Sequence, residues 1–174
     1  MVDLPQSAGA LSAQTLALAA GLIADAAQRS AEEWEAAAQA QAQALGLGRR
    51  ALALGAINEE AYRGAVAALA GELPPTPAET RDQMLGDMLD RAAEAPLALA
   101  KTAADIAVLG ALVGEHGPDQ AGADAIAAAV VALGVARATT HLVAVNLATR
   151  EDDPRLYQAR QEVGRASAAL PDGV

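Results

Sequence analysis

Residues 118–150 hold several side chains that could do acid–base or binding chemistry, set in unusually apolar surroundings. Asp124 and Arg137 flank twelve consecutive apolar residues, numbers 125–136, and His141 and Asn146 follow. If this run is helical, it must be buried on most of its circumference. Polar groups buried beside it cost free energy unless they are paired or used. The segment therefore indicates a polar pocket inside a helical bundle, where such folds build their sites.

Helical geometry divides these polar residues between separate places. Asp124 and Asn146 lie within about 40° of each other around a helix but about 33 Å apart along it, so they cannot share one site within the chain. Arg137 and His141 are four residues apart and stack on one face. Asp124 is our candidate for proton transfer and His141 for substrate binding, and Asn146 becomes a helix-end residue. The alternative is that Asp124 caps the helix, with Arg137 and His141 on an outer face or at a dimer rim.

Two other stretches could supply polar groups to a pocket. Arg50 and Asn58 are eight residues apart, so they fall two turns apart near one helix face. An arginine there could bind the carboxylate tail of a substrate, although a solvated Arg49–Arg50 pair explains it equally well. Pro96 frees a backbone carbonyl near residue 92 and could bring Glu94 into a cavity. The alternative is that the proline only bends the helix.

The composition predicts an all-α fold. Alanine occupies 49 of the 174 positions, and the chain has no Phe, one Trp and two Tyr. Alanine is the best helix former, and the aromatic residues that favour strands are scarce. Because small side chains let helices approach closely, the packing must depend on shape more than on bulky anchors.

Turn and cap residues divide the chain into four long helices and one short one. Ser30 before two glutamates and Thr76 before Pro77 are the expected N-caps of the second and third helices. We predict one domain over residues 1–174, an up-and-down bundle with a frayed tail from about residue 169. The expected helices span residues 7–28, 31–70, 77–113, 118–150 and 152–168.

Charge and composition argue against several classes of function. The formal charge is −10 with Lys101 the single lysine, which argues against nucleic acids and anionic membranes as partners. The chain has no cysteine and two histidines without metal-ligand spacing, so we expect no metal. The longest uninterrupted apolar run, twelve residues, is short of the ~20 that a membrane span needs. The first ten residues have no basic n-region of a secretory signal, so we expect a soluble cytoplasmic protein.

The order of segments resembles the cyclodeaminase/cyclohydrolase family, which comprises formiminotetrahydrofolate cyclodeaminases and methenyltetrahydrofolate cyclohydrolases. The likeness rests on four stretches: LPQSAGALSAQTLALAAGLIADAA, INEEAYRGAV, AAEAPLALAKTAADI and QAGADAIAAAVVALGVARATTHLVAVNL. It implies an all-helical homodimer with a folate pocket near the subunit interface and no cofactor besides the tetrahydrofolate substrate. The implied chemistry is hydrolysis of a methenyl bridge, or loss of ammonia from a formimino group with ring closure.

Several positions depart from the family pattern. The family opens with proline, a run of glycines and a serine, of which Gly9 is the glycine that survives here. Asn58 stands where the family usually has aspartate, and Leu142 stands where it has asparagine. Gln120 and Asp124 match an asparagine and the aspartate of a serine–aspartate pair. The site residues that we predict are, for catalysis, Asp124, Asn58 and Glu94, and for substrate binding, Arg50, Gly9, Gln120 and His141.

Three functions follow from these observations. The first is a small-molecule enzyme with the folate activity of the family. The second is the same dimeric scaffold used for cyclisation or elimination on a non-folate substrate in specialised metabolism. The third is a non-catalytic bundle that dimerises or binds a partner. In each case we expect a homodimer, because two helices are apolar nearly all round and a monomer of five helices cannot bury both.

Overall fold

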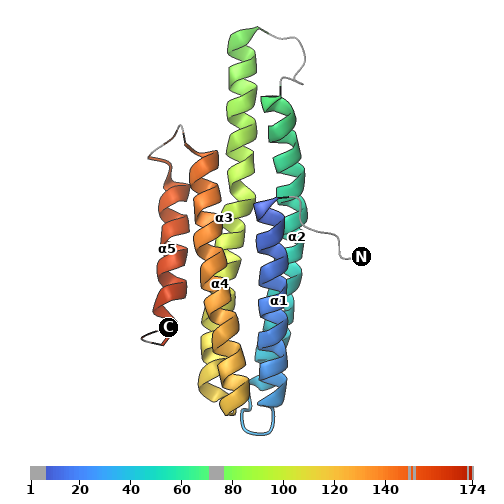
Figure 1. The fold of residues 1–174 in the computed structure, drawn as a ribbon, viewed down its shortest axis with the longest axis vertical. Helices are drawn as coiled ribbons and strands as arrows, with labels where there is room; N and C mark the ends of the chain where they lie inside the picture. Colours follow the sequence, from blue (N-terminus) through green and yellow to red (C-terminus); the bar gives the residue numbers. More distant parts are fainter. Residues whose placement is uncertain (1–6, 71–76, 149, 151, 172, 174) are drawn as a thin grey trace.

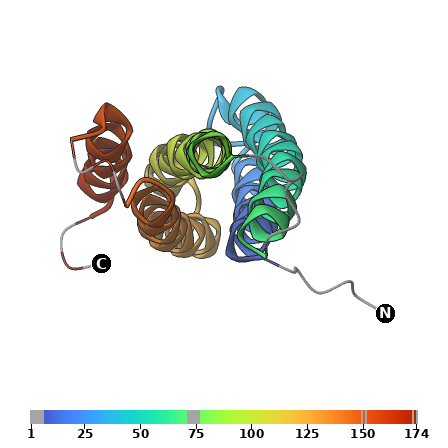
Figure 2. The same cartoon turned by 90° about the horizontal axis from the view of Figure 1, so that it is seen from above.

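The computed structural model describes residues 7–70, 77–148, 150, 152–171 and 173, and these residues form an up-and-down bundle (Figure 1). No strand occurs in the described part of the chain, which confirms the all-α prediction. The central four helices pack on one another, whereas α5 lies outside, against α3 and α4 (Figure 2). The helices are α1 (Ala8–Arg29), α2 (Ala37–Leu69), α3 (Ala78–His116), α4 (Asp119–Asn146) and α5 (Pro154–Ala168).

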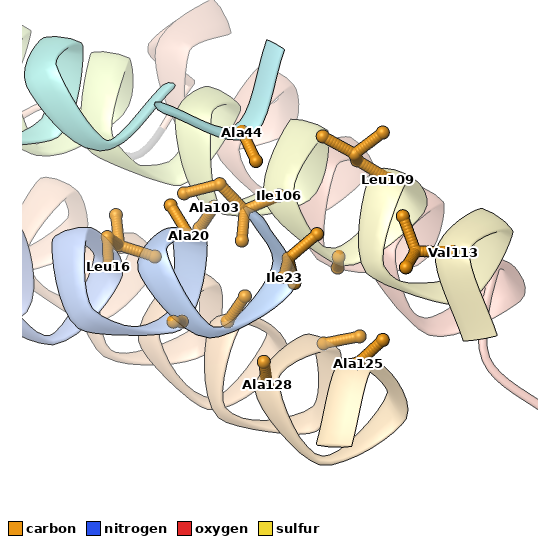
Figure 3. Packing of buried hydrophobic residues seen from close by; sticks show 14 of the residues in the cluster. Leu16, Ala20, Ile23, Ala44, Ala103, Ile106, Leu109, Val113, Ala125 and Ala128 are labelled. Atoms are coloured by element: carbon orange, nitrogen blue, oxygen red, sulfur yellow. The ribbon is translucent and has the colours of Figure 1, made fainter. Parts of the chain in front are cut away.

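Small residues bring the helices close together at the centre of the bundle. Figure 3 shows a few fully buried branched side chains, Leu16, Ile23 and Ile106 among them, set between alanines of several helices. Gly110 marks a place where α3 packs closely against both α1 and α4. A Cβ atom added there would lie 2.9 Å from the Ala125 carbonyl oxygen and equally close to Ile23. The core is therefore filled by close backbone approach, as the alanine content predicts.

The turn between α1 and α2 differs from the prediction. Ser30 ends α1 instead of starting α2: its backbone N–H bonds to the carbonyls of Ala26 and Ala27, and its hydroxyl donates to Ala26. Residues 30–36 form turns, and α2 begins at Ala37, six residues later than expected. Trp34 packs on the core from this turn. Its ring stacks on His116 with centroids 4.8 Å apart, which fixes the turn beside the end of α3.

The other helix ends also shift by a few residues. The third helix begins at Ala78, so Pro77 is its N-cap residue and not, as predicted, its first helical residue, and the helix runs to His116 rather than about residue 113. The predicted cap Thr76 lies outside the described residues. The fourth helix stops at Asn146 rather than near residue 150. The fifth starts at Pro154 behind Asp153, whose carboxylate accepts from the Arg155 backbone N–H at 2.9 Å. The Arg155 guanidinium bonds to the same carboxylate and holds the pKa of Asp153 down at about 2.

Arg155 also joins α5 to α3. Its guanidinium donates to the Asp90 carboxylate at 2.9 Å and to the Asp90 backbone carbonyl at 3.0 Å. Arg150 pairs with the other oxygen of the same carboxylate at 2.6 Å. This half-buried network places the start of α5 against the middle of α3.

Apolar side chains remain exposed on α1 and α4, which pack side by side at the front of Figure 1. Leu11, Leu18 and Leu22 are exposed on α1, and Val131 and Val145 on α4. By length and composition alone, α1, α3 and α4 could each cross a membrane, since a few charged residues within a span are tolerated. The twelve-residue uninterrupted run therefore understates the apolar length of these helices. In the bundle, 67% of the most apolar stretch of α3 is buried, compared with 44% for α4.

We predict that Gly110→Ala lowers the free energy of unfolding by about 1–3 kcal/mol, because the new methyl group overpacks the α3–α4 contact. The matched control is Gly164→Ala on α5, where an added Cβ meets no atom within 4 Å. That change should raise the free energy of unfolding by about 0.5–1 kcal/mol through helix propensity. Urea denaturation of both variants followed by circular dichroism measures the difference. Equal effects of the same sign would contradict the close-packed core.

Candidate functional site

Four helices meet around a cavity at the level where α1 begins and α4 ends. Beyond this level α2 and α3 continue as a two-helix extension, seen at the top of Figure 1. The cavity has a volume of about 290 Å³. Because carboxamides from α2 and α4 both line it, we call it the asparagine cavity. Its lining residues are Ser7, Ala8, Gly9, Asn58, Tyr62, Ala65, Ala92, Pro96, Leu142, Val145 and Asn146.

Asn146 is held in the cavity wall by a backbone carbonyl that the proline of α3 leaves without its helical partner. Pro96 has no backbone N–H, so the Ala92 carbonyl, four residues earlier, loses its helical partner. The Asn146 side-chain Nδ2 donates to that carbonyl at 2.8 Å. A buried carbonyl left without a donor would cost free energy, so this bond is needed where the helices pack. With Nδ2 engaged, Oδ1 is the Asn146 atom left to accept a hydrogen bond from a ligand.

Asn58 is fixed from the other side by the start of α1. Its side chain is 7% exposed, and its Nδ2 lies 3.4 Å from the Ser7 hydroxyl. Ser7 is the N-cap of α1 and accepts from the Ala10 backbone N–H at 3.2 Å. Gly9 makes room for this arrangement. A Cβ on Gly9 would overlap the Asn58 carboxamide, 2.6 Å from Oδ1, so any larger residue would displace Asn58.

The cavity offers hydrogen-bonding groups and no charge of its own. Among its described lining residues, none is acidic, basic or histidine. A charged group lies one hydrogen bond away: the Glu59 carboxylate accepts from the Ser7 hydroxyl at 2.8 Å. The α1 N-terminus, which opens onto the cavity, adds the partial positive charge of its free N–H groups. The site can therefore orient a polar ligand through neutral groups and can move a proton through Ser7.

The predicted site residues fall in different parts of the molecule. Gly9 and Asn58 both line the asparagine cavity. Asp124 lies at the opposite end of α4, where its carboxylate pairs with Arg29 at 2.7 Å. The separation from Asn146 is about 33 Å at the ~1.5 Å rise of a helix. Gln120 is exposed in the first turn of α4, at the same end as Asp124.

The other three candidates lie outside the asparagine cavity. Glu94 is exposed and lines a separate cleft of about 510 Å³ between α2 and α3, together with Arg91 and Glu60. Arg50 is half exposed and lies 4.0 Å from the Asp105 carboxylate, whereas Asn58 is buried against α1. His141 is exposed on α4. The structure thus brings two of the seven predicted residues together, and the functional roles of all seven stay predictions.

Three polar lining residues were not among the sequence candidates for the site: Ser7, Tyr62 and Asn146. The sequence does indicate that Pro96 frees a carbonyl near residue 92. Because a buried carbonyl needs a donor, this predicts a polar side chain on a neighbouring helix, and Asn146 is that side chain. Nothing in the sequence pairs residue 92 with residue 146, however. That pairing depends on α4 ending beside the middle of α3, which only the assembled bundle defines.

We predict that Asn146→Ala lowers the free energy of unfolding by about 1–3 kcal/mol, because it leaves the Ala92 carbonyl unsatisfied. In a Pro96→Ala background the new backbone N–H can reach that carbonyl, so the same substitution should cost much less. The coupling energy of this double-mutant cycle should be about 1 kcal/mol or more. Urea denaturation of the four proteins measures it.

A control double-mutant cycle combines Pro96→Ala with Thr140→Ala instead of Asn146→Ala. The Thr140 hydroxyl donates to the Ala159 carbonyl on α5 at 3.2 Å. Thr140→Ala and Pro96→Ala should be additive, because the two residues share no acceptor. Additivity in the Asn146 cycle would show that the carboxamide is not the partner of the freed carbonyl.

Comparison with known proteins agrees with the resemblance seen in the sequence. The family model of formiminotransferase-cyclodeaminase matches residues 6–165. Curated proteins gave no sequence match. The fold is similar to the crystal structure of formiminotetrahydrofolate cyclodeaminase from Thermotoga maritima, with a TM-score of 0.73 and 18% sequence identity over 97% of this chain and 84% of that chain. The chain therefore belongs to the formiminotransferase-cyclodeaminase family.

Proposed function

We propose that this protein is a small-molecule enzyme that acts on a one-carbon derivative of tetrahydrofolate in the asparagine cavity. The observation that carries the proposal is the convergence of Asn58, Asn146 and Ser7 on one cavity in a chain of this family. The solved relative of similar fold is described as a formiminotetrahydrofolate cyclodeaminase. Bundles build small-molecule sites from side chains of facing helices, which is the arrangement here.

The reaction that these groups suit best is hydrolysis of the methenyl bridge. That bridge is a cationic amidinium, and water adds to its carbon before one carbon–nitrogen bond breaks to leave a formyl group. The Asn146 Oδ1 can accept from the attacking water, and the Asn58 carboxamide can bind the polar edge of the pterin ring. Ring closure of a formimino group with loss of ammonia passes through the same carbon centre. Both reactions need bound water or amine to be oriented and one proton to be moved.

The size of the cavity bears on how a folate would sit. At about 290 Å³ it lies just below the usual range for ligand pockets, roughly 300–1,000 Å³. A cavity of this size would hold the reacting ring system of a folate and not the whole molecule. Tyr62 lines the cavity and is 48% exposed, so the remainder of the substrate would extend from the cavity into solvent past the Tyr62 side chain.

The folate activity is tested by following the ultraviolet absorbance of methenyltetrahydrofolate in the presence of the purified protein. We expect loss of the methenyl chromophore faster than in buffer. Asn58→Ala should lower kcat/KM by at least ~10-fold, equivalent to about 1.4 kcal/mol of lost transition-state binding. No acceleration by the wild-type protein would refute the folate proposal.

Asp124→Asn is the informative companion variant. It removes a carboxylate whose ion pair with Arg29 is 40% exposed and contributes little to stability. If the asparagine cavity is the site, this variant keeps its activity. A large loss in Asp124→Asn with normal activity in Asn58→Ala would place the reaction at the other end of α4, beside Asp124.

A second candidate is the same scaffold acting on a non-folate molecule by cyclisation or elimination. The observation in its favour is the lining itself, which has no charged group and includes apolar Leu142, Val145 and Pro96. Thermal stabilisation by a non-folate ligand without any effect of folates would support it. Stabilisation by 5-formyltetrahydrofolate would count against it.

We also propose that the protein is a cytoplasmic homodimer whose interface covers the exposed apolar residues of α1 and α4. Five large aliphatic side chains on two adjacent helices form a surface of the kind that marks an interface. The chain has no cysteine and so forms no disulfide that would require an oxidising compartment, which supports the proposed cytoplasmic location. A second copy would bury the apolar face and leave the charged residues in water.

We predict a species of about 35 kDa, twice the chain mass of 17.4 kDa, in sedimentation experiments at micromolar concentration without detergent. Leu18→Glu, at a site that is 77% exposed in the single chain, should convert the dimer to monomer. Tyr157→Glu on α5, 66% exposed and away from this face, is the control and should leave the dimer intact. A 17 kDa species for the wild type, or a requirement for detergent, would contradict the proposal.

A further inference from the structure

Ser7 lies between the asparagine cavity and a carboxylate that the cavity itself does not contain. Its hydroxyl lines the cavity and donates to Glu59 Oε2 at 2.8 Å. Glu59 lines a different surface groove, between α1 and α2, and is half-buried. A proton that leaves a ligand in the cavity therefore has a two-bond path to a carboxylate near solvent, through one hydroxyl.

Two donors fix the direction of the Ser7 hydroxyl. The Ala10 backbone N–H donates to Ser7 Oγ at 3.2 Å, and Asn58 Nδ2 lies within donating distance at 3.4 Å. Both donors approach the lone-pair side of Oγ, so Ser7 directs its own proton at Glu59. The Asn58 contact, at 3.4 Å, is longer than an ordinary N–H···O bond, so a water in the cavity can take its place and donate to Oγ. The Ala10 N–H and the α1 N-terminus stabilise negative charge on Oγ when the Ser7 proton moves.

The role of Ser7 as the N-cap of α1 does not explain why its hydroxyl bonds to the Glu59 carboxylate. The cap of α1 is complete once Ser7 accepts from Ala10. In a capping box the acidic partner would stand at the third helical position of the same helix, which is Ala10 here. Glu59 comes instead from α2, 52 residues away in the chain, and takes up the hydroxyl proton rather than a backbone N–H.

We propose that Ser7 and Glu59 form the proton relay of the asparagine cavity, with Ser7 the catalytic residue and Glu59 the proton acceptor behind it. The inference rests on the proposed folate hydrolysis. Water adds its oxygen to the methenyl carbon and gives one proton to Ser7 Oγ, while Ser7 gives its own proton to Glu59. The cationic substrate and the hydroxide so formed make a neutral hydroxy adduct, and Glu59 is protonated.

Collapse of the adduct runs the relay in reverse. The carbon–nitrogen bond breaks, the nitrogen takes its proton from Ser7, and Ser7 is reprotonated by Glu59. The hydroxyl of the adduct becomes the formyl oxygen and its proton passes to solvent. One water is consumed and one proton is released overall, with no change of oxidation state.

The relay is tested on the full-length protein with methenyltetrahydrofolate as substrate. Ser7→Gly keeps a residue that is tolerated at an N-cap but removes the hydroxyl, and Glu59→Gln keeps the size of the side chain without the carboxylate. Each should lower kcat by ~10²-fold or more with KM little changed, and the double variant should be no worse than either single one. Ser7→Thr should retain most of kcat, and added formate should restore activity to Glu59→Ala but not to Ser7→Gly.

Thr15→Ala and Glu60→Gln are the matched controls. Thr15 is a hydroxyl residue of α1 that bonds only to the Leu11 carbonyl among the described contacts, and Glu60 is an exposed neighbour of Glu59 that faces the separate cleft. Both should keep wild-type kcat, and circular dichroism checks that every variant is folded. Wild-type activity with unchanged kcat in Ser7→Gly or Glu59→Gln would overturn the relay and leave the folate function standing. An inactive wild type would overturn the folate function and the relay together.

Discussion

Close approach of alanine and glycine faces is the physical constraint on which the rest of the structure depends. With 49 alanines and no phenylalanine, the chain gains its buried area from many small contacts rather than from large anchors. Gly110 shows how little tolerance this leaves, since an added methyl group would meet a backbone carbonyl of α4 at 2.9 Å. The hydroxyls buried within such closely held helices, such as those of Thr102 and Thr139, bond to backbone carbonyls of their own helix and are not free for a ligand. Functional groups are therefore confined to places where a helix begins, ends or loses a backbone bond.

The asparagine cavity lies where all three of these conditions coincide. The start of α1 contributes Ser7 and Gly9, the end of α4 contributes Asn146, and Pro96 interrupts the hydrogen bonding of α3. Each polar group has a partner that fixes its orientation: Asn146 bonds to the Ala92 carbonyl, and Asn58 lies beside Ser7. A site held by such partners is preorganised, which favours chemistry on a small polar substrate. Because none of the described lining residues is charged, it is the Ser7 hydroxyl that connects the cavity to a carboxylate, that of Glu59.

The sequence predicted the fold class, the number and order of the helices and the family, because these follow from helix propensity, turn residues and segment order. It predicted Gly9 and Asn58 as members of one site from their places in the family pattern, and both line the cavity. It favoured Asp124 because a carboxylate beside an apolar run looked buried, whereas Arg29 of α1 pairs with it at the surface. That partner comes from 95 residues away, and helical periodicity carries no information on such a contact. The same holds for Asn146, whose importance depends on a carbonyl of another helix.

Binding of a folate ligand at the asparagine cavity is the claim on which the proposed function depends. A crystal structure of the protein with 5-formyltetrahydrofolate, a stable product of the proposed hydrolysis, tests it most directly. We expect the pterin ring in the cavity, with its polar edge against Asn58 and its formyl group within hydrogen-bond reach of Asn146 or Ser7. A ligand bound beside Asp124 and Arg29, or no bound ligand at saturating concentration, would contradict the claim.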